Sequence, residues 1–119
     1  MLTREFADGF AREWIEAWNS HNLDRILARY TDDFEMRSPV IVRVADEASG
    51  RSQGKKAVGA YWAKALAANP GLHFELITTL RGISSIVIYY RGVRGLAAEL
   101  FEFDESGLVA RSAAHYADL

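Results

Sequence analysis

The stretch Trp18–Pro39, WNSHNLDRILARYTDDFEMRSP, contains the point at which a helical pattern gives way to a strand-like one. In its first half the apolar side chains are spaced i, i+3, i+4 and i+7, as on one face of a helix that Asn22 can cap. These side chains are Leu23, Ile26, Leu27 and Tyr30. After Asp33 the pattern becomes a strict alternation of apolar and polar side chains up to Pro39, which is typical of a half-buried strand. The sequence therefore predicts a short helix that leads directly into a strand.

Two longer helices are predicted on either side of this stretch. Upstream, large rings recur every four residues, and Thr3 can cap the helix that carries them. Downstream of Gly54, a second apolar face repeats at helical spacing and stops at the Asn-Pro-Gly of residues 69–71. The first face consists of Phe6, Phe10, Trp14 and Trp18, and the second of Val58, Tyr61, Trp62, Ala65 and Leu66. Three helices are therefore expected in all.

The rest of the chain has the pattern of strands. Residues 40–44, VIVRV, are expected to continue the strand that Pro39 interrupts or to form a bent second strand. Residues 45–54 are polar and are expected to form one long loop, as a rim or lid. From Leu72 onward, short turns separate four strand-like runs, which predicts an antiparallel meander. This order indicates an α+β fold, one domain over residues 1–119 with the helices on one face of a curved, mainly antiparallel sheet.

Composition excludes several classes of function. Fourteen Lys and Arg against 16 Asp and Glu give a net charge of −2, so binding to nucleic acid is not expected. The chain has no Cys, and its three His have no metal-ligand spacing, so neither a disulfide nor a metal site is expected. No apolar run approaches the roughly 20 residues of a membrane span. We expect a soluble, cytoplasmic protein without a cofactor.

Three stretches carry a resemblance to a known family. They are WIEAWNSHNLDRILARYTDDFEMRSP at 14–39, QGKKAVGAYWAKAL at 53–66 and AAELFEFDESGLVARSAAHY at 97–116. In this order they resemble the nuclear transport factor 2-like (NTF2-like) superfamily, which includes the ketosteroid isomerases and the SnoaL-like polyketide cyclases. The resemblance implies a cone-shaped fold in which the helices and the concave face of the sheet enclose an apolar pocket. It also implies a homodimer through the other face of the sheet.

The resemblance to the steroid isomerases places particular residues. Their catalytic base, an aspartate directly before the proline, falls on Ser38, and their late-strand acid falls on Glu99. The tyrosine of their first helix falls on Trp14, and their supporting tyrosines on Tyr30 and Trp62. A serine hydroxyl cannot accept a proton at neutral pH without a base of its own, so steroid-isomerase chemistry is not expected here. At the first-helix position, Trp14 can still donate one indole N–H to a ligand.

Glu99 is the main candidate for chemistry because it interrupts a strand that is apolar on both faces. Burial there predicts a raised pKa unless the carboxylate is paired. Two interpretations stay open: an acid or hydrogen-bond donor inside a pocket, or a structural carboxylate satisfied by an arginine or a tyrosine. The pocket around it is expected to bind a small apolar or aromatic molecule. Its predicted lining is Trp14, Trp18, Tyr30, Met36, Ser38, Tyr61, Trp62, Phe74, Phe101, Ser112 and Tyr116.

Three functions remain possible at this stage. The first is isomerase-, cyclase- or dehydratase-type acid–base chemistry through Glu99. The others are a ligand-binding module without catalysis and a protein-interaction module whose pocket is filled by its own rings. The acidic cluster of Asp32, Asp33 and Glu35 is interpreted as a solvated turn and an outer strand face. The homodimer is expected to form through the apolar outer face that carries Leu96, Ala98, Leu100, Ala113 and His115.

Overall fold

The computed structural model describes residues 1–119 and contains four helices and one six-stranded sheet. The helices are α1 (Arg4–Ser20), α2 (Leu23–Leu27), α3 (Pro39–Val44) and α4 (Lys55–Ala68). The strands are β1 (Tyr30–Arg37), β2 (Arg51–Gln53), β3 (Glu75–Arg81), β4 (Ser85–Gly92), β5 (Gly95–Phe103) and β6 (Val109–Tyr116). Their order across the sheet is β2-β1-β6-β5-β4-β3. The α+β class and the three predicted helices are confirmed, and α3 is an additional helix.

The first two helices lie where the sequence predicted helices, and side chains cap both of them. The hydroxyl of Thr3 accepts a hydrogen bond from the backbone N–H of Phe6 at 3.0 Å, at the start of α1. The side chain of Asn22 accepts one from the N–H of Arg25 at 3.1 Å, at the start of α2. The helix ends earlier than predicted, because α2 stops at Leu27 and Tyr30 is already the first residue of β1.

The last four strands form the predicted antiparallel meander, with β3 paired to β4, β4 to β5 and β5 to β6. Two further strands extend the sheet beyond β6: β1 pairs in parallel with β6, and β2 pairs antiparallel with β1. Along β5, Ala97, Glu99 and Phe101 are buried on one face, as the alternation predicted. The residues between them, Ala98 and Leu100, are partly exposed on the other face.

The prediction of a strand over residues 40–44 is wrong, because these residues form the short helix α3. Pro39 occupies the first turn of the helix, where its fixed φ angle and missing N–H suit a helix start. The hydroxyl of Ser38 accepts a hydrogen bond from the N–H of Val40 at 3.1 Å and so caps α3. This capping overrides the strand preference of the Val-Ile-Val run, since β-branched residues are only slightly unfavourable in helices.

The polar segment at residues 45–54 is also more ordered than predicted, because it contains β2. The N–H of Ser38 donates to the carbonyl of Gly50 at 2.9 Å, which extends the pairing of β1 with β2 beyond the strand ends. Gly50 has a φ angle of +69°, and a Cβ there would lie 3.2 Å from the carbonyl oxygen of Ser38. This close approach of two backbone segments requires glycine.

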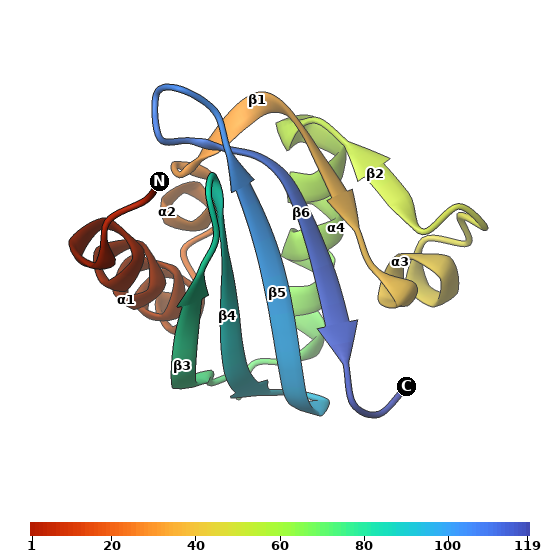
Figure 1. Ribbon diagram of the computed structural model, residues 1–119. Helices are drawn as coiled ribbons and strands as arrows, with labels where there is room; N and C mark the ends of the chain where they lie inside the picture. The colour runs from red at the N-terminus through yellow and green to blue at the C-terminus, as the bar shows by residue number, and fades with distance from the viewer.

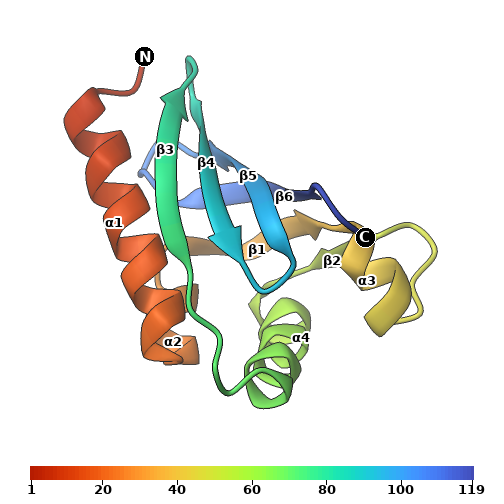
Figure 2. The same ribbon diagram turned by 90° about the horizontal axis from the view of Figure 1, so that it is seen from below.

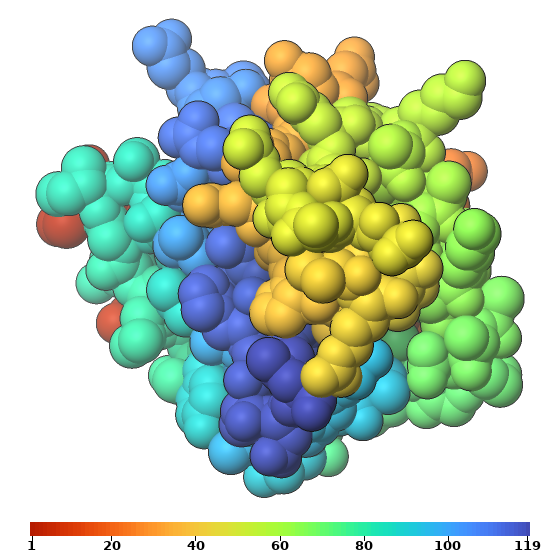
Figure 3. Space-filling model, turned by 90° about the vertical axis from the view of Figure 1, so that its right-hand side faces the viewer, coloured from red at the N-terminus to blue at the C-terminus, as the bar shows by residue number.

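The helices lie on one side of the sheet. Figure 1 shows the outer face of β4, β5 and β6 toward the viewer with no helix in front of it, and α4 behind it. Figure 2 shows α1 beside β3 at one end of the curved sheet and α4 facing the concave side from below. In Figure 3, α3 and the loop after it (yellow) lie between the C-terminal strand (dark blue) and α4 (green). None of the helices is long and apolar enough to cross a membrane.

Candidate functional site

A cavity of about 380 Å³ lies between the concave face of the sheet and the helices. Most of its wall is apolar, since 15 of the 20 lining residues are hydrophobic. Its polar groups are the side chains of Lys64, Asn69, Arg94 and Glu99 and the hydroxyl groups of three of the hydrophobic residues, Tyr61, Tyr90 and Tyr116. The volume falls within the range of about 300–1,000 Å³ that is usual for small-molecule sites.

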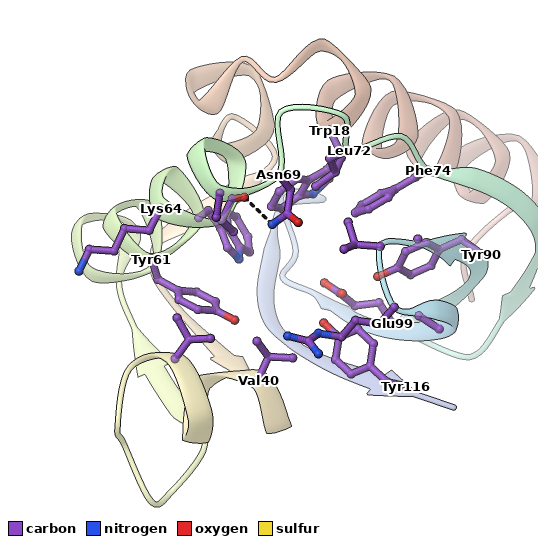
Figure 4. A pocket seen from close by; sticks show the side chains of 18 of the residues that line it. Trp18, Val40, Tyr61, Lys64, Asn69, Leu72, Phe74, Tyr90, Glu99 and Tyr116 are labelled. Carbon is purple, nitrogen blue, oxygen red and sulfur yellow. Dashed lines mark hydrogen bonds between the residues drawn. The ribbon is translucent and has the colours of Figure 1, made fainter. Parts of the chain in front are cut away.

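Eight of the residues named from the sequence do line this cavity: Trp14, Trp18, Met36, Tyr61, Trp62, Phe74, Glu99 and Tyr116. They come from α1, β1, α4, the segment before β3, β5 and β6. The structure therefore brings together rings that are far apart in the sequence. Figure 4 shows Tyr61 reaching in from α4 on one side, and Tyr116 on the opposite side with Glu99 beside it.

The remaining predicted residues lie outside the lining. Tyr30 is 1% exposed and lies behind the wall, and Phe101 is completely buried against Phe10 with ring centroids 5.0 Å apart. Ser112 donates its hydroxyl hydrogen to the sulfur of Met36 at 2.9 Å. Ser38 is buried and caps α3, and it lines a shallow groove on the outer face of the sheet. At this position, then, a helix cap replaces the base of the steroid isomerases.

Several lining residues were not named from the sequence, and Tyr90 and Arg94 are the two that matter chemically. Tyr90 is buried on β4, and its neighbour Tyr89 points to the other face. The run SIVIYY has two adjacent tyrosines, so alternation alone leaves open which of them faces inward. Arg94 lies in the turn between β4 and β5, and no periodic pattern assigns a direction to a turn residue. Lys64 and Asn69 lie at the edge of the apolar face predicted for α4.

The carboxyl group of Glu99 is the only acidic group in the lining. The residue is 4% exposed, and in Figure 4 its carboxyl group points into the cavity between the hydroxyl groups of Tyr90 and Tyr116. Burial raises its pKa to about 8, and burial is the only cause of this shift. No donor or cation is close enough to hold the charged form. Glu99 is therefore mostly a neutral carboxylic acid at neutral pH.

Four tyrosines surround Glu99 on the elements packed against it. Burial raises the pKa of Tyr116 to about 12 and that of Tyr90 still further, and the charge of Glu99 adds to both shifts. The pKa values of Tyr30 and Tyr61 are raised as well, mainly by burial and then in part by Glu99. All four hydroxyl groups consequently keep their protons at neutral pH. Those of Tyr61, Tyr90 and Tyr116 line the cavity and can donate hydrogen bonds to an occupant.

Two indole N–H groups in the wall differ in their pairing. Trp14 was a candidate donor to a ligand, but its Nε1–H donates to the hydroxyl of Tyr30 at 3.2 Å. Trp18 is 6% exposed, and its buried Nε1–H has no acceptor in the protein. A buried donor without a partner costs about 1–3 kcal/mol of stability. Trp18, rather than Trp14, is thus the wall indole with a free donor.

The acidic cluster of β1 lies outside the cavity. The carboxylate of Glu35 forms ion pairs with Arg51 at 2.6 Å and Arg37 at 3.6 Å. Asp32 is exposed and lies 3.6 Å from the ammonium of Lys55, and Asp33 accepts a hydrogen bond from Thr31. These pairings fit the interpretation of the cluster as surface residues. No three His, Asp or Glu side chains lie together in an arrangement that could hold a metal ion.

The family follows from comparison with known proteins. The model of the SnoaL-like domain matches residues 11–112, which is most of the chain. The chain belongs to the SnoaL-like domain family. It is similar in structure to a SnoaL-like protein of unknown function from Burkholderia thailandensis, at 55% identity, with 97% of each chain covered and a TM-score of 0.95. The predicted SnoaL-like, NTF2-like α+β fold is therefore confirmed.

Two more distant structures of the same fold contain ligands. Protein RV0760c of Mycobacterium tuberculosis, in complex with estradiol-17beta-hemisuccinate, matches at 18% identity over 93% of each chain with a TM-score of 0.75. TerC, co-crystallized with polyporic acid, matches at 12% identity over 93% of this chain and 91% of its own, with a TM-score of 0.73. No curated protein matches the chain.

Proposed function

We propose that the protein binds a small apolar or aromatic molecule in this cavity and that Glu99 acts on an oxygen atom of that molecule as a neutral acid. The observation that carries the proposal is a buried carboxyl group that faces the cavity without a protein partner. A carboxyl group needed only for structure would be paired. Here its hydrogen-bonding capacity is left for an occupant.

The chemistry follows from the protonation states. With a pKa of about 8, Glu99 can donate its O–H to a carbonyl oxygen and polarise it, which makes a neighbouring C–H more acidic. The protonated tyrosines offer no base at neutral pH. The roughly one tenth of Glu99 that is ionised near pH 7 is the one base in the lining. In this ionised form the carboxylate can remove a proton and return it elsewhere, as isomerase- or lyase-type reactions require, and the hydroxyl groups of Tyr90 and Tyr116 are then the donors left for the substrate oxygen.

The walls favour a planar or polycyclic occupant. Trp14 and Phe74 are nearly parallel with centroids 5.4 Å apart, and Trp18 meets Trp62 edge to face at 5.2 Å. The ligands of RV0760c and TerC, a steroid ester and polyporic acid, support an occupant of this size and chemistry.

A second candidate is a ligand-binding module without catalysis. The specific observation in its favour is that Ser38, onto which the resemblance places the base of the steroid isomerases, is engaged in capping α3. The cavity also contains no second carboxyl group to pair with Glu99 as acid and base. In this alternative Glu99 donates a hydrogen bond that orients the ligand, and no proton is transferred.

A ligand screen followed by one substitution separates the two candidates. Thermal-shift measurements against steroids, polyketides, terpenoids and aromatic acids identify a stabilising compound, and its conversion is then followed by mass spectrometry. Catalysis predicts conversion by the wild type and a loss of turnover of at least about 100-fold in Glu99→Gln. Stabilisation without conversion supports the binding module. An ordinary carboxyl pKa of Glu99 in an NMR titration would contradict both.

We also propose that two copies associate through the outer face of the sheet. Leu96, Ala98 and Leu100 are partly exposed there, and a shallow groove on this face is lined in part by Leu100, Ala113 and His115. No helix covers these strands (Figure 1). Light scattering at micromolar concentration should give the mass of a dimer, and Leu100→Glu should shift it toward the monomer. A monomer mass for the wild type would contradict the proposal.

A further inference from the structure

Two basic side chains line the cavity, and neither has an acidic partner. Arg94 lies in the two-residue turn between β4 and β5, and Lys64 lies on α4. Both are exposed. Ion pairs elsewhere occupy Arg4, Arg25, Arg37, Arg51, Lys55 and Arg111, but none involves Lys64 or Arg94. The lining thus combines an apolar wall with two cations whose charge is not neutralised within the protein.

Of these two cations, Arg94 is the one whose charged group lies near the tyrosine hydroxyl groups of the cavity. Its positive charge partly opposes the raised pKa of both Tyr61 and Tyr116, so its guanidinium lies near these two phenols. The phenols come from opposite sides of the cavity, α4 and β6. Figure 4 shows the ammonium of Lys64 pointing away from Glu99, so that only its aliphatic stem lines the cavity. Arg94, and not Lys64, is therefore the basic residue whose charged group can contact a molecule in the cavity.

We infer that the occupant is an apolar or aromatic acid whose anionic group is bound by Arg94, between the hydroxyl groups of Tyr61 and Tyr116, while its ring system lies among the tryptophans. The inference rests on the proposed small-molecule function and specifies the class of ligand. A guanidinium binds a carboxylate or sulfonate with charge-assisted hydrogen bonds. Two phenol hydroxyls can add donors to the same anion.

No other group of the cavity repels an anion bound beside Arg94 at neutral pH. Glu99 is the only acid in the lining, and it is mostly uncharged at neutral pH. The titratable groups that face it are Tyr30 on β1, Tyr61 on α4, Tyr90 on β4, Tyr116 on β6 and Arg94 in the β4–β5 turn. The four tyrosines are protonated at neutral pH, so none of them repels the anion. Above about pH 8 Glu99 ionises, and affinity for an anionic occupant should fall.

A pair of fluorescent probes tests the inference. Anilinonaphthalene sulfonate carries an aromatic body and one anionic group, and phenylnaphthylamine has the same aromatic body without the charge. Both are titrated into the full-length protein, and competition between them establishes that they share one site. In Arg94→Gln, the affinity for the sulfonate should fall about tenfold, and the affinity for the neutral probe should stay within about twofold. Arg94→Lys should recover part of the loss.

Arg91→Gln provides the matched control. Arg91 is exposed near the end of β4, just before the turn that carries Arg94, and it does not line the cavity. Its substitution removes the same charge. This variant should bind both probes like the wild type, and all variants should keep the unfolding midpoint of the wild type.

The outcomes separate the inference from the function on which it rests. If neither probe binds the wild type, or if they do not compete, the proposed small-molecule site fails. If both bind and Arg94→Gln weakens them equally or not at all, the site stands and the role of Arg94 is overturned. If Arg91→Gln weakens the sulfonate as much as Arg94→Gln does, general surface charge explains the effect, and the inference is likewise overturned.

Discussion

The two halves of α1 face the same sheet with similar rings, yet one half is packed solid and the other borders a cavity. In the first half, Phe10 meets Phe101 and Phe103 edge to face, with centroids 5.0 and 4.9 Å apart. In the second half, Trp14 and Trp18 contact other rings but leave about 380 Å³ unfilled. We refer to these regions as the filled end and the hollow end.

The difference lies in what β5 presents beneath the helix. Under the filled end β5 carries Phe101 and Phe103, whose rings occupy the space between helix and sheet. Under the hollow end the same face of β5 carries Ala97 and Glu99, one small and one polar. The change from two large rings to Ala97 and Glu99 along a single strand thus separates a packed core from a cavity. The carboxyl group lies where the large rings stop.

The largest expected effect tests packing at the two ends with the same substitution. Phe10→Ala should lower the free energy of unfolding by about 3–5 kcal/mol, because it removes a completely buried ring from interlocked neighbours. Phe74→Ala should cost clearly less, because Phe74 already borders empty space on one side. Urea denaturation measures both values. Equal losses would mean that the hollow end is packed as tightly as the filled end.

The next effect concerns the pH dependence of stability at the hollow end. The pKa of Glu99 is about 8 in the folded protein and near 4.5 in the unfolded chain, so the folded state holds the proton more tightly. The contribution of this group to the free energy of unfolding is therefore complete below about pH 4.5. It decreases as the pH rises from there and is lost once the pH passes the folded pKa of about 8. The loss should reach roughly 3 kcal/mol between about pH 5 and pH 7.5.

Glu99→Gln should remove this decrease of the unfolding free energy with rising pH, because an amide does not titrate. The difference in unfolding free energy between wild type and variant, measured by urea denaturation at both pH values, isolates the contribution of Glu99 from that of other groups. A difference that does not change with pH would show that Glu99 has an ordinary pKa.

A smaller effect comes from adding volume at each end. Ala11→Leu on α1 should destabilise the protein by about 1–3 kcal/mol, because Ala11 is completely buried in packed surroundings. Ala65→Leu on α4 should be nearly neutral for stability, since Ala65 lines the cavity and the added methyl groups have space. The same variant should weaken probe binding. Thermal unfolding and probe titration measure these effects. If Ala65→Leu destabilised the protein as much as Ala11→Leu and left probe binding unchanged, the result would argue against a cavity at α4.

The smallest effect tests the role of Ser38 beside the hollow end. Ser38→Ala should cost about 1 kcal/mol of stability through the lost cap of α3, and Ser38→Asp should retain most of it, because aspartate is an equally good cap. Chemical denaturation of the three proteins measures the order. Loss of stability in Ser38→Asp greater than in Ser38→Ala would contradict the capping role.

Much of the fold was predictable because its signals are local. The aromatic stripe of α1, the caps at Thr3 and Asn22, and the short turns of the meander each depend on neighbouring residues. The burial of Glu99 followed in the same way from the alternation along β5. Residues 40–44 show the limit of this reasoning. Their composition favours a strand, but the cap at Ser38 and the proline after it start a helix.

The sequence by itself determined that one acid would lie in an apolar strand, that a serine would stand before Pro39, and that the rings would lie on one face of α1. Only the tertiary structure decided that part of this face borders a cavity and that Tyr90 and Arg94 join it. The physical reason is that a cavity depends on the distance between α1, α4 and the curved sheet, and on the volumes of side chains distant in sequence. Local periodicity specifies which face is buried, whereas the space left between buried faces is set by how all the elements pack together.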